Sequence, residues 1–450
     1  MIDSLVTDLV STCFPVRMRP STGIGTVLCA VLGALFVAAP AEATGSGTAR
    51  VSGADVVYTA AKDARNRVVV TRSGGTVTVD DRVPVRAGAG CTAVRGDRTR
   101  VICRTAATPG GLRVVTGDRA DSIVNRSGLP LTADGGTGSD TIIGGPEADT
   151  LRGGGGRDRL HGAGGDDQLD GGPGDDRLLG GAGDDWLRAP GGRVASTDRD
   201  VLWGGPGIDV ADYTSAATPV TADADGVTGD DGRRGERDTL KNDIEALIGG
   251  SAGDRLSGTS RQDFLRGGPG NDTLLGYGGG DHLVGELGAD LLDGGSGDDS
   301  LRGDDPGLGA LSADVMRGGP GTDFVVYATY VTPVVVDLDG QPGDDGQAGE
   351  RDTVGADVEN ISGGQAGDRL TGNASANRID AGPGDDVIHG GAGNDVLIGL
   401  DGRDSIHGEA GDDEIGDYDV DADLLDGGDH VTLGDRCVIS GDDTIISCER

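Results

Sequence analysis

The chain has 450 residues, of which 87 are glycine and only 3% are aromatic, and its formal net charge at pH 7 is -38. Such a composition excludes a large conventional hydrophobic core and is typical of disordered chains, because little apolar area is available to offset the entropy of ordering. A surface this acidic argues against nucleic acid and anionic membranes as partners and favours cations.

The start of the chain predicts a secretory signal peptide. The basic residues Arg17 and Arg19 precede an apolar run at 27–39, and the sequence Ala-Glu-Ala at 41–43 matches a cleavage signature. The apolar run is too short to span a bilayer, and no later segment is apolar for about 18 residues. We therefore expect a secreted, extracellular protein without a transmembrane segment, and assign 1–43 to the signal peptide.

Residues 44–130 predict a small antiparallel β module. Two runs rich in valine and threonine, 68–71 and 76–79, flank a glycine-containing turn at 72–75. Alternating β-branched runs around such a turn are typical of a β-hairpin. The segment 117–123 has the form of a degenerate first repeat of the pattern that follows.

Four cysteines remain after the signal peptide, in two local pairs: Cys91 with Cys103, and Cys437 with Cys448. Neither pair has the C-x-x-C spacing or the nearby histidines that a metal site needs. Close spacing in an oxidising compartment favours local closure. We therefore expect two disulfides, one in the β module and one in a disulfide-closed tail at 417–450.

From residue 131 onward an aspartate recurs every nine residues, and an aliphatic side chain follows it two residues later. The unit reads Gly-Gly-x-Gly-x-Asp-x-U-x, where U is a large aliphatic residue, as at 171–179. Blocks of this unit occupy 131–203, 249–317 and 363–416. The sixth-position aspartates are Asp140, Asp149, Asp158, Asp167, Asp176, Asp185, Asp209, Asp254, Asp263, Asp272, Asp281, Asp290, Asp299, Asp323, Asp368, Asp386, Asp395, Asp404 and Asp413. Asn377 replaces aspartate at one sixth position.

This unit closely resembles the RTX, or hemolysin-type, calcium-binding nonapeptide repeat. The resemblance implies an all-β fold of parallel β-roll blocks, in which several Ca²⁺ ions are held between turns by the sixth-position aspartates and by loop carbonyls. At Asn377 we expect weaker or absent binding. Two nonapeptides make one coil, so aspartates such as Asp149 and Asp167 should stack about 4.8 Å apart. Glycine permits the sharp turns, and the strand alternation directs U inward.

Two acidic, glycine-rich inserts, 204–248 and 318–362, separate the three roll blocks. The second insert repeats the first at an offset of 318 − 204 = 114 residues, so that Asp223, Asp225 and Asp230 correspond to Asp337, Asp339 and Asp344. Their carboxylates predict either a second class of calcium loop, since Ca²⁺ prefers several oxygen ligands in flexible loops, or an acidic surface excursion. The sequence leaves both interpretations open.

The repeat also predicts that folding depends on calcium. One buried aliphatic residue in nine is too little apolar area to offset the ordering entropy, and stacked carboxylates repel one another. Calcium would reverse this balance, because its binding free energy becomes folding free energy.

No catalytic site is expected. Residues 249–253 satisfy the G-x-S-x-G pattern of hydrolases, but they lie in the repeat register ahead of Asp254. No histidine begins an H-E-x-x-H motif, and two Arg-Gly-Asp tripeptides, 95–97 and 302–304, are expected by chance in a chain of this composition. We therefore expect a non-enzymatic protein.

The order of modules also resembles secreted calcium-binding proteins of high-GC Gram-positive bacteria, and the basic residues include only two lysines, Lys62 and Lys241. Two alternatives remain. The first is a cell-surface or matrix interaction protein that uses calcium structurally and binds a cell-wall or matrix partner. The second is an enzyme with an unrecognised site on the roll.

Overall fold

The computed structural model describes residues 45–188, 198–309, 311–416, 418–429, 434–438 and 443–448. The predicted signal peptide lies outside the described residues. Every regular element in the described part is a β-strand, and the strands run from β1 (Gly47–Ser52) to β43 (Thr444–Ile446). No helix there is long and apolar enough to cross a membrane.

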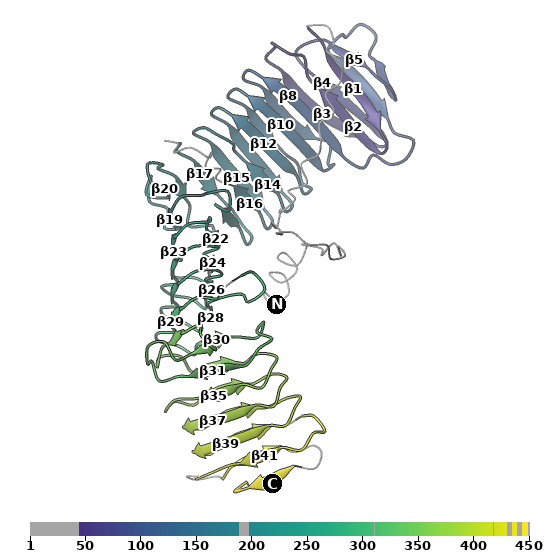
Figure 1. Ribbon diagram of the computed structural model, residues 1–450. Helices are drawn as coiled ribbons and strands as arrows, with labels where there is room; N and C mark the ends of the chain where they lie inside the picture. The colour runs from purple at the N-terminus through teal and green to yellow at the C-terminus, as the bar shows by residue number, and fades with distance from the viewer. Residues whose placement is uncertain are drawn as a thin grey trace, which may run out of the picture. The chain divides into compact units, whose positions relative to one another are not determined.

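Successive coils of the chain stack in parallel at the spacing of two nonapeptides (Figure 1). Strand β12 (Thr150–Gly155) pairs in parallel with β14 (Gln168–Asp170), which places Leu151 opposite Leu169, 18 residues later. On the neighbouring face of the roll, Leu160 lies opposite Leu178, which is also 18 residues later. The predicted all-β class and the two-repeat coil are therefore confirmed.

The strands on one side of the roll belong to one sheet of 19 strands, whereas the other side is divided among sheets of 10, 7 and 7 strands. Each change of sheet takes place at an insert. In the first insert, β21 (Thr239–Leu240) is an edge of the ten-stranded sheet, and β19 (Val220–Asp223) pairs with β23 (Arg255–Ser257) in the next sheet. Because β18 (Val210–Asp212) still pairs in parallel with β22 (Ala246–Ile248), the roll continues through this insert.

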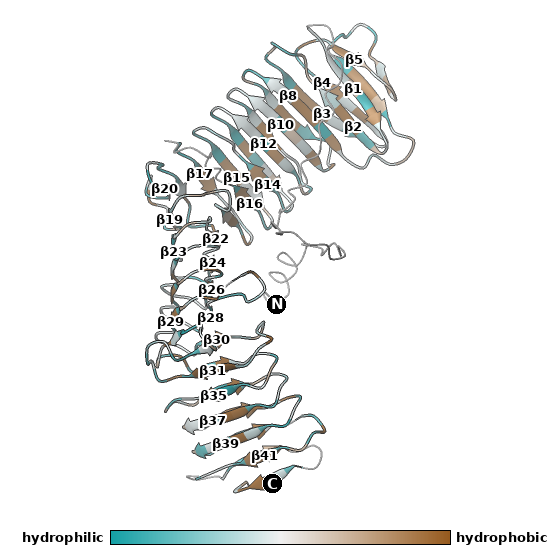
Figure 2. Cartoon of the chain, viewed as in Figure 1, coloured by the Kyte–Doolittle hydropathy of each residue, from teal (hydrophilic) through white to brown (hydrophobic). Residues whose placement is uncertain are grey.

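The core is a column of the aliphatic U side chains. Leu151, Leu169 and Leu187 on one side, and Leu160 and Leu178 on the other, are each at most 1% exposed. The alternation of a strand directs the residues on either side of U toward solvent. Figure 2 shows hydrophobic residues concentrated on the strands, as the repeat predicts.

The N-terminal module differs from the prediction in one respect. Its hairpin is confirmed, since β3 (Arg67–Ser73) and β4 (Thr76–Asp80) pair antiparallel. However, β2 (Asp55–Thr59) pairs in parallel with β8 (Leu112–Asp118), and β8 pairs in parallel with β10 (Leu131–Thr137). The module is therefore mixed, and coils of the roll begin before residue 131. Apart from the degenerate repeat at 117–123, no local pattern indicates such pairing between distant segments.

Roll geometry also extends into the described part of the tail. Strand β42 (Arg436–Val438) pairs in parallel with β40 (Glu414–Gly416), and β43 pairs in parallel with β41 (Leu424–Asp426). Both predicted disulfides are present, Cys91–Cys103 and Cys437–Cys448.

Candidate metal sites

The sixth-position aspartates form ladders along the inside of the turns. All those predicted as ligands are buried, with 0–3% of each residue exposed. Oδ1 of Asp158 accepts the main-chain N–H of Asp140 at 2.7 Å, and Oδ1 of Asp176 accepts that of Asp158 at 2.7 Å. Each carboxylate is thus held by the backbone of the coil before it, and stacking of the coils fixes its position.

The second oxygen of most ladder carboxylates has no hydrogen-bond partner. It is buried, and no described residue donates to it. Among the predicted ligands this is true of Asp140, Asp158, Asp167, Asp176, Asp185, Asp209, Asp272, Asp281, Asp290, Asp299, Asp323, Asp386, Asp395 and Asp413. An unpartnered buried oxygen of a carboxylate is costly. These atoms are oxygen donors of the kind that Ca²⁺ prefers.

The electrostatic environment of the ladder is unfavourable for bare carboxylates. Burial disfavours the charged form and is the largest cause of the raised pKa values. Together with the charges of neighbouring aspartates, it outweighs the backbone hydrogen bonds, which lower the pKa. These effects raise the pKa of Asp176 to about 7, and those of Asp167 and Asp281 to about 8. At neutral pH these carboxylates are therefore half or more protonated in the metal-free fold, and a bound cation would favour the ionised form.

Glycine is required in these turns for close stacking as well as for backbone conformation. Gly172 has a φ of 85°, and a Cβ on it would lie 1.8 Å from the carbonyl oxygen of Gly154 in the preceding coil. A Cβ on Gly174 would lie 1.4 Å from the carbonyl oxygen of Gly156. The turns of successive coils therefore pack backbone against backbone, which concentrates carbonyl oxygens beside the aspartates.

A second type of turn occurs at the first coils of the blocks. Here Oδ2 of the aspartate accepts the N–H of the residue four positions earlier, which does not adopt a positive φ. These bonds join Gly145 to Asp149, Gly250 to Asp254, Thr259 to Asp263 and Gly364 to Asp368. In these four predicted ligands Oδ2 is already satisfied by the backbone. The geometry therefore favours a structural role for them over metal binding.

Asn377 adopts this second turn type without a charge. Its Oδ1 accepts the N–H of Asn373 at 2.8 Å, and its Nδ2 donates to the carbonyl oxygen of Glu359 at 2.7 Å. The amide is therefore satisfied by neutral partners. This arrangement agrees with the expectation of weak or absent metal binding at that position.

The ladder also contains aspartates that the nine-residue register did not identify. Oδ1 of Asp200 accepts the N–H of Asp176 at 2.8 Å, and Oδ1 of Asp314 accepts that of Asp290 at 2.8 Å, both across 24 residues instead of 18. Asp423 and Asp435 extend the ladders in the tail. Extra residues in the turns break the register. The sequence signal that remains is the apolar residue two positions later: Leu202, Met316, Leu425 and Cys437.

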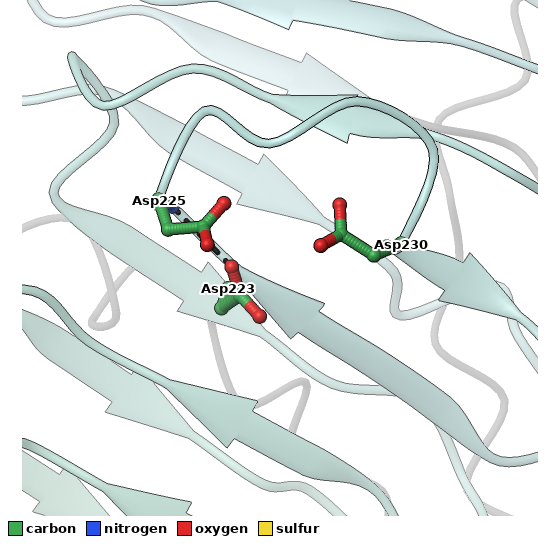
Figure 3. Close-up of side chains that lie close together, drawn as sticks. All are labelled: Asp223, Asp225 and Asp230. Carbon is green, nitrogen blue, oxygen red and sulfur yellow. Dashed lines mark hydrogen bonds between the residues drawn. The ribbon is translucent and has the colours of Figure 1, made fainter.

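The inserts bring three further aspartates together on the loop that follows β19. Side-chain oxygens of Asp223, Asp225 and Asp230 lie within 4.8 Å of one another (Figure 3). The corresponding residues of the second insert, Asp337, Asp339 and Asp344, form the same triad. Asp225 and Asp230 are exposed, so this geometry is compatible with both interpretations drawn from the sequence.

Two sequence motifs that resemble functional sites, G-x-S-x-G and the second Arg-Gly-Asp, form part of the folded roll. Oγ of Ser251 donates to the carbonyl oxygen of Ala216 at 3.2 Å, within a turn of the roll. Asp304, the acidic residue of the second Arg-Gly-Asp tripeptide, is fully buried.

Comparison with known proteins agrees with this geometry. The family model for the RTX calcium-binding nonapeptide repeat (4 copies) matches residues 134–169, 170–192, 248–283, 275–305, 362–397 and 389–415. No curated protein matches the chain. The matched stretches contain most of the stacked turns in which the aspartate ladders lie. The chain therefore contains RTX calcium-binding nonapeptide repeats.

Proposed function

We propose that the chain is a secreted calcium-binding protein whose RTX repeats fold on binding Ca²⁺. The observation that carries this proposal is the row of buried, unpartnered Oδ2 atoms along the aspartate ladders. A cation between the turns supplies the interaction that these oxygens lack. Its binding free energy then contributes to the stability of the roll.

The donor set indicates which ion fits. Asp176, Asp281 and their equivalents offer carboxylate oxygens, and the glycine turns offer main-chain carbonyl oxygens. Oxygen-only sites favour hard cations over zinc or copper. Ca²⁺ tolerates six to eight ligands in flexible geometry, whereas Mg²⁺ demands near-octahedral geometry and loses its water reluctantly. The turns are therefore assigned to Ca²⁺.

Export and a role without catalysis complete the proposal. Export is supported by the predicted signal peptide and by the two disulfides, which persist in oxidising compartments. A non-enzymatic role is supported by the hydrogen bond of Ser251 to a main-chain carbonyl oxygen. A cell-surface or matrix protein that presents its acidic face to a partner is the alternative, and retention on cell-wall material with and without chelator separates the two.

Calcium binding by the ladder is tested with two neighbouring aspartates. Asp176→Asn removes a ladder carboxylate, whereas Asp175→Asn removes a surface carboxylate that pairs with Arg157 at 2.6 Å. Exposed ion pairs of this kind contribute little to stability. In calorimetric titrations with Ca²⁺ we expect lower affinity and fewer bound ions for Asp176→Asn only. Equal effects of the two substitutions would mean that Ca²⁺ only screens bulk charge.

A further inference from the structure

The two inserts are copies of each other, but they differ in how their buried carboxylates are compensated. In the first insert, Glu236 forms an ion pair with Arg233, and both side chains are at most 6% exposed. In the second insert, Gln347 takes the place of Arg233, and no arginine of the described residues forms an ion pair with Glu350. The same fold therefore contains a buried cation in one copy and lacks it in the other.

The second insert also has an additional buried acid. Asp304 lies on the loop after β28 (Ser300–Arg302) and is 0% exposed, and in the sequence it corresponds to Pro190 of the first copy. Its Oδ2 accepts the N–H of Ser312, but its Oδ1 is buried without a partner. The half-buried Asp198 of the first copy is replaced by Ser312 in the second.

Four buried carboxylates that influence one another lie in this part of the second insert: Asp304, Asp314, Glu350 and Asp352, here called the junction cluster. A Cβ on Gly346 would lie 2.6 Å from Oε2 of Glu350 and 2.9 Å from Oδ2 of Asp352, so these two oxygens face the same small space. At the equivalent Gly232 the nearest atoms are Oδ2 and Cγ of Asp238 and then Cβ of Glu236 at 3.1 Å, while the Glu236 carboxylate binds Arg233.

Burial, followed by the charge of Glu350, raises the pKa of Asp304 to about 6. Asp304 in turn contributes to the raised pKa values of Asp314 and Asp352, and the main-chain N–H of Asp314 donates to Oδ1 of Asp352 at 3.0 Å. No lysine, arginine or histidine of the described chain forms an ion pair with a member of the cluster. Oδ2 of Asp314 is also buried without a partner.

Two tyrosines hold the cluster in place. The Tyr327 hydroxyl donates to Oδ2 of Asp352 at 2.9 Å, and the Tyr330 hydroxyl donates to Oε1 of Glu350 at 2.5 Å. Tyr330 has no counterpart in the first copy, where Ala216 stands at its position. In the second insert, where Gln347 corresponds to Arg233, the Tyr330 hydroxyl thus donates a hydrogen bond to Glu350 but supplies no positive charge.

We propose that the junction cluster of the second insert is a binding site for a divalent cation of the Ca²⁺ class, and that the first insert has no such site because Arg233 supplies the positive charge there. The site lies where the ladder enters the insert, outside the nonapeptide register. Among the described residues, only the two exposed triads bring three acidic side chains within 4.8 Å. At the present separations no more than two of the cluster's carboxylates would contact one ion, and water or main-chain carbonyl oxygens would complete its coordination.

The test counts bound Ca²⁺ in the full-length chain by native mass spectrometry. Asp304→Asn should hold one ion fewer than the natural chain, whereas Asp305→Asn, one residue later and only partly buried, should hold the same number. The double variant Tyr330→Ala, Gln347→Arg recreates the arginine arrangement of the first insert. It should also lose one ion and keep its β-sheet circular dichroism, and this readout remains informative if Asp304→Asn fails to fold.

An unchanged ion count in both Asp304→Asn and the double variant would overturn the site. The proposed function is distinguished by Asp176→Asn in the same experiment. If Asp176→Asn loses bound Ca²⁺ while the junction variants do not, the turns bind calcium and only this inference is wrong. If the natural chain holds no Ca²⁺ at all, the proposed function is contradicted as well.

Discussion

The main-chain N–H of Asp254 donates a hydrogen bond of 2.6 Å to Oδ1 of Asp272, one coil further along the roll. The two carboxylates share a ladder but differ at their second oxygen. Oδ2 of Asp254 accepts the N–H of Gly250, whereas Oδ2 of Asp272 is buried and has no partner. This difference separates turns in which the backbone satisfies both carboxylate oxygens from turns in which one buried oxygen has no donor.

The first prediction uses this pair. Asp272→Asn should lower the number of bound Ca²⁺ ions, because it removes a ligand. Asp254→Asn should leave the number unchanged but lower the free energy of unfolding in Ca²⁺ by about 1–3 kcal/mol. The reason is that an amide has one oxygen and cannot accept the N–H groups of both Val220 and Gly250. Calorimetry and urea denaturation measure the two effects. Equal loss of bound calcium in both variants would show that the two turn types are not functionally distinct.

The second prediction concerns pH in the absence of calcium. Burial raises the pKa of Asp176 to about 7 and that of Asp167 to about 8, above the value of about 3.9 in unfolded chains. The folded, metal-free roll therefore binds more protons than the unfolded chain. The stability contributed by these groups is fully present below about pH 4 and is lost as the pH rises through 7 to 8.

In chelator we therefore expect more β-sheet circular dichroism at about pH 5 than at about pH 8. With Ca²⁺ present the trend should reverse, because protons compete with the ion for the same oxygens. A β-sheet signal in chelator that increases toward pH 8 would contradict the assignment of the buried carboxylates.

The third prediction concerns the core. Leu178→Ala removes a fully buried U side chain and should lower the free energy of unfolding in Ca²⁺ by about 2–5 kcal/mol. Leu179→Ala, the next residue, alters a side chain that is 37% exposed, so its effect should be much smaller. Urea denaturation followed by circular dichroism compares the two. Similar losses would mean that the strand alternation is misassigned.

The fourth prediction is that Ser251 is not a nucleophile. Its hydroxyl donates to a main-chain carbonyl oxygen, and a Ser nucleophile needs a base within hydrogen-bond reach. A fluorophosphonate probe should therefore not label the calcium-loaded chain. Labelling that disappears in Ser251→Ala would contradict both this prediction and the proposed non-enzymatic role.

The nine-residue period was sufficient to predict the coil, the inward aliphatic residues and the ladder aspartates, because each coil contacts only its neighbours. It did not identify Asp200 or Asp314, which follow turns with extra residues, although both keep an apolar residue two positions later. It also did not distinguish Asp254 from Asp272, because the difference depends on the backbone conformation at the second position of the turn.

The parallel pairing of β2 with β8 had no sequence signal either. Val56 lies opposite Leu112, and partners so distant in the chain cannot be recognised from local alternation. The junction cluster needed the structure for a similar reason: Asp314 and Asp352 are far apart in sequence, and only folding of the insert brings the N–H of Asp314 within 3.0 Å of Oδ1 of Asp352.

The most direct test of the account is circular dichroism of the chain in chelator at neutral pH, followed by addition of Ca²⁺ to roughly millimolar concentration, the range of extracellular modules. The account predicts a largely disordered spectrum in chelator and a β-rich spectrum after Ca²⁺ is added, with Mg²⁺ substituting poorly. A native-like β spectrum in chelator that does not change on addition of Ca²⁺ would contradict calcium-driven folding.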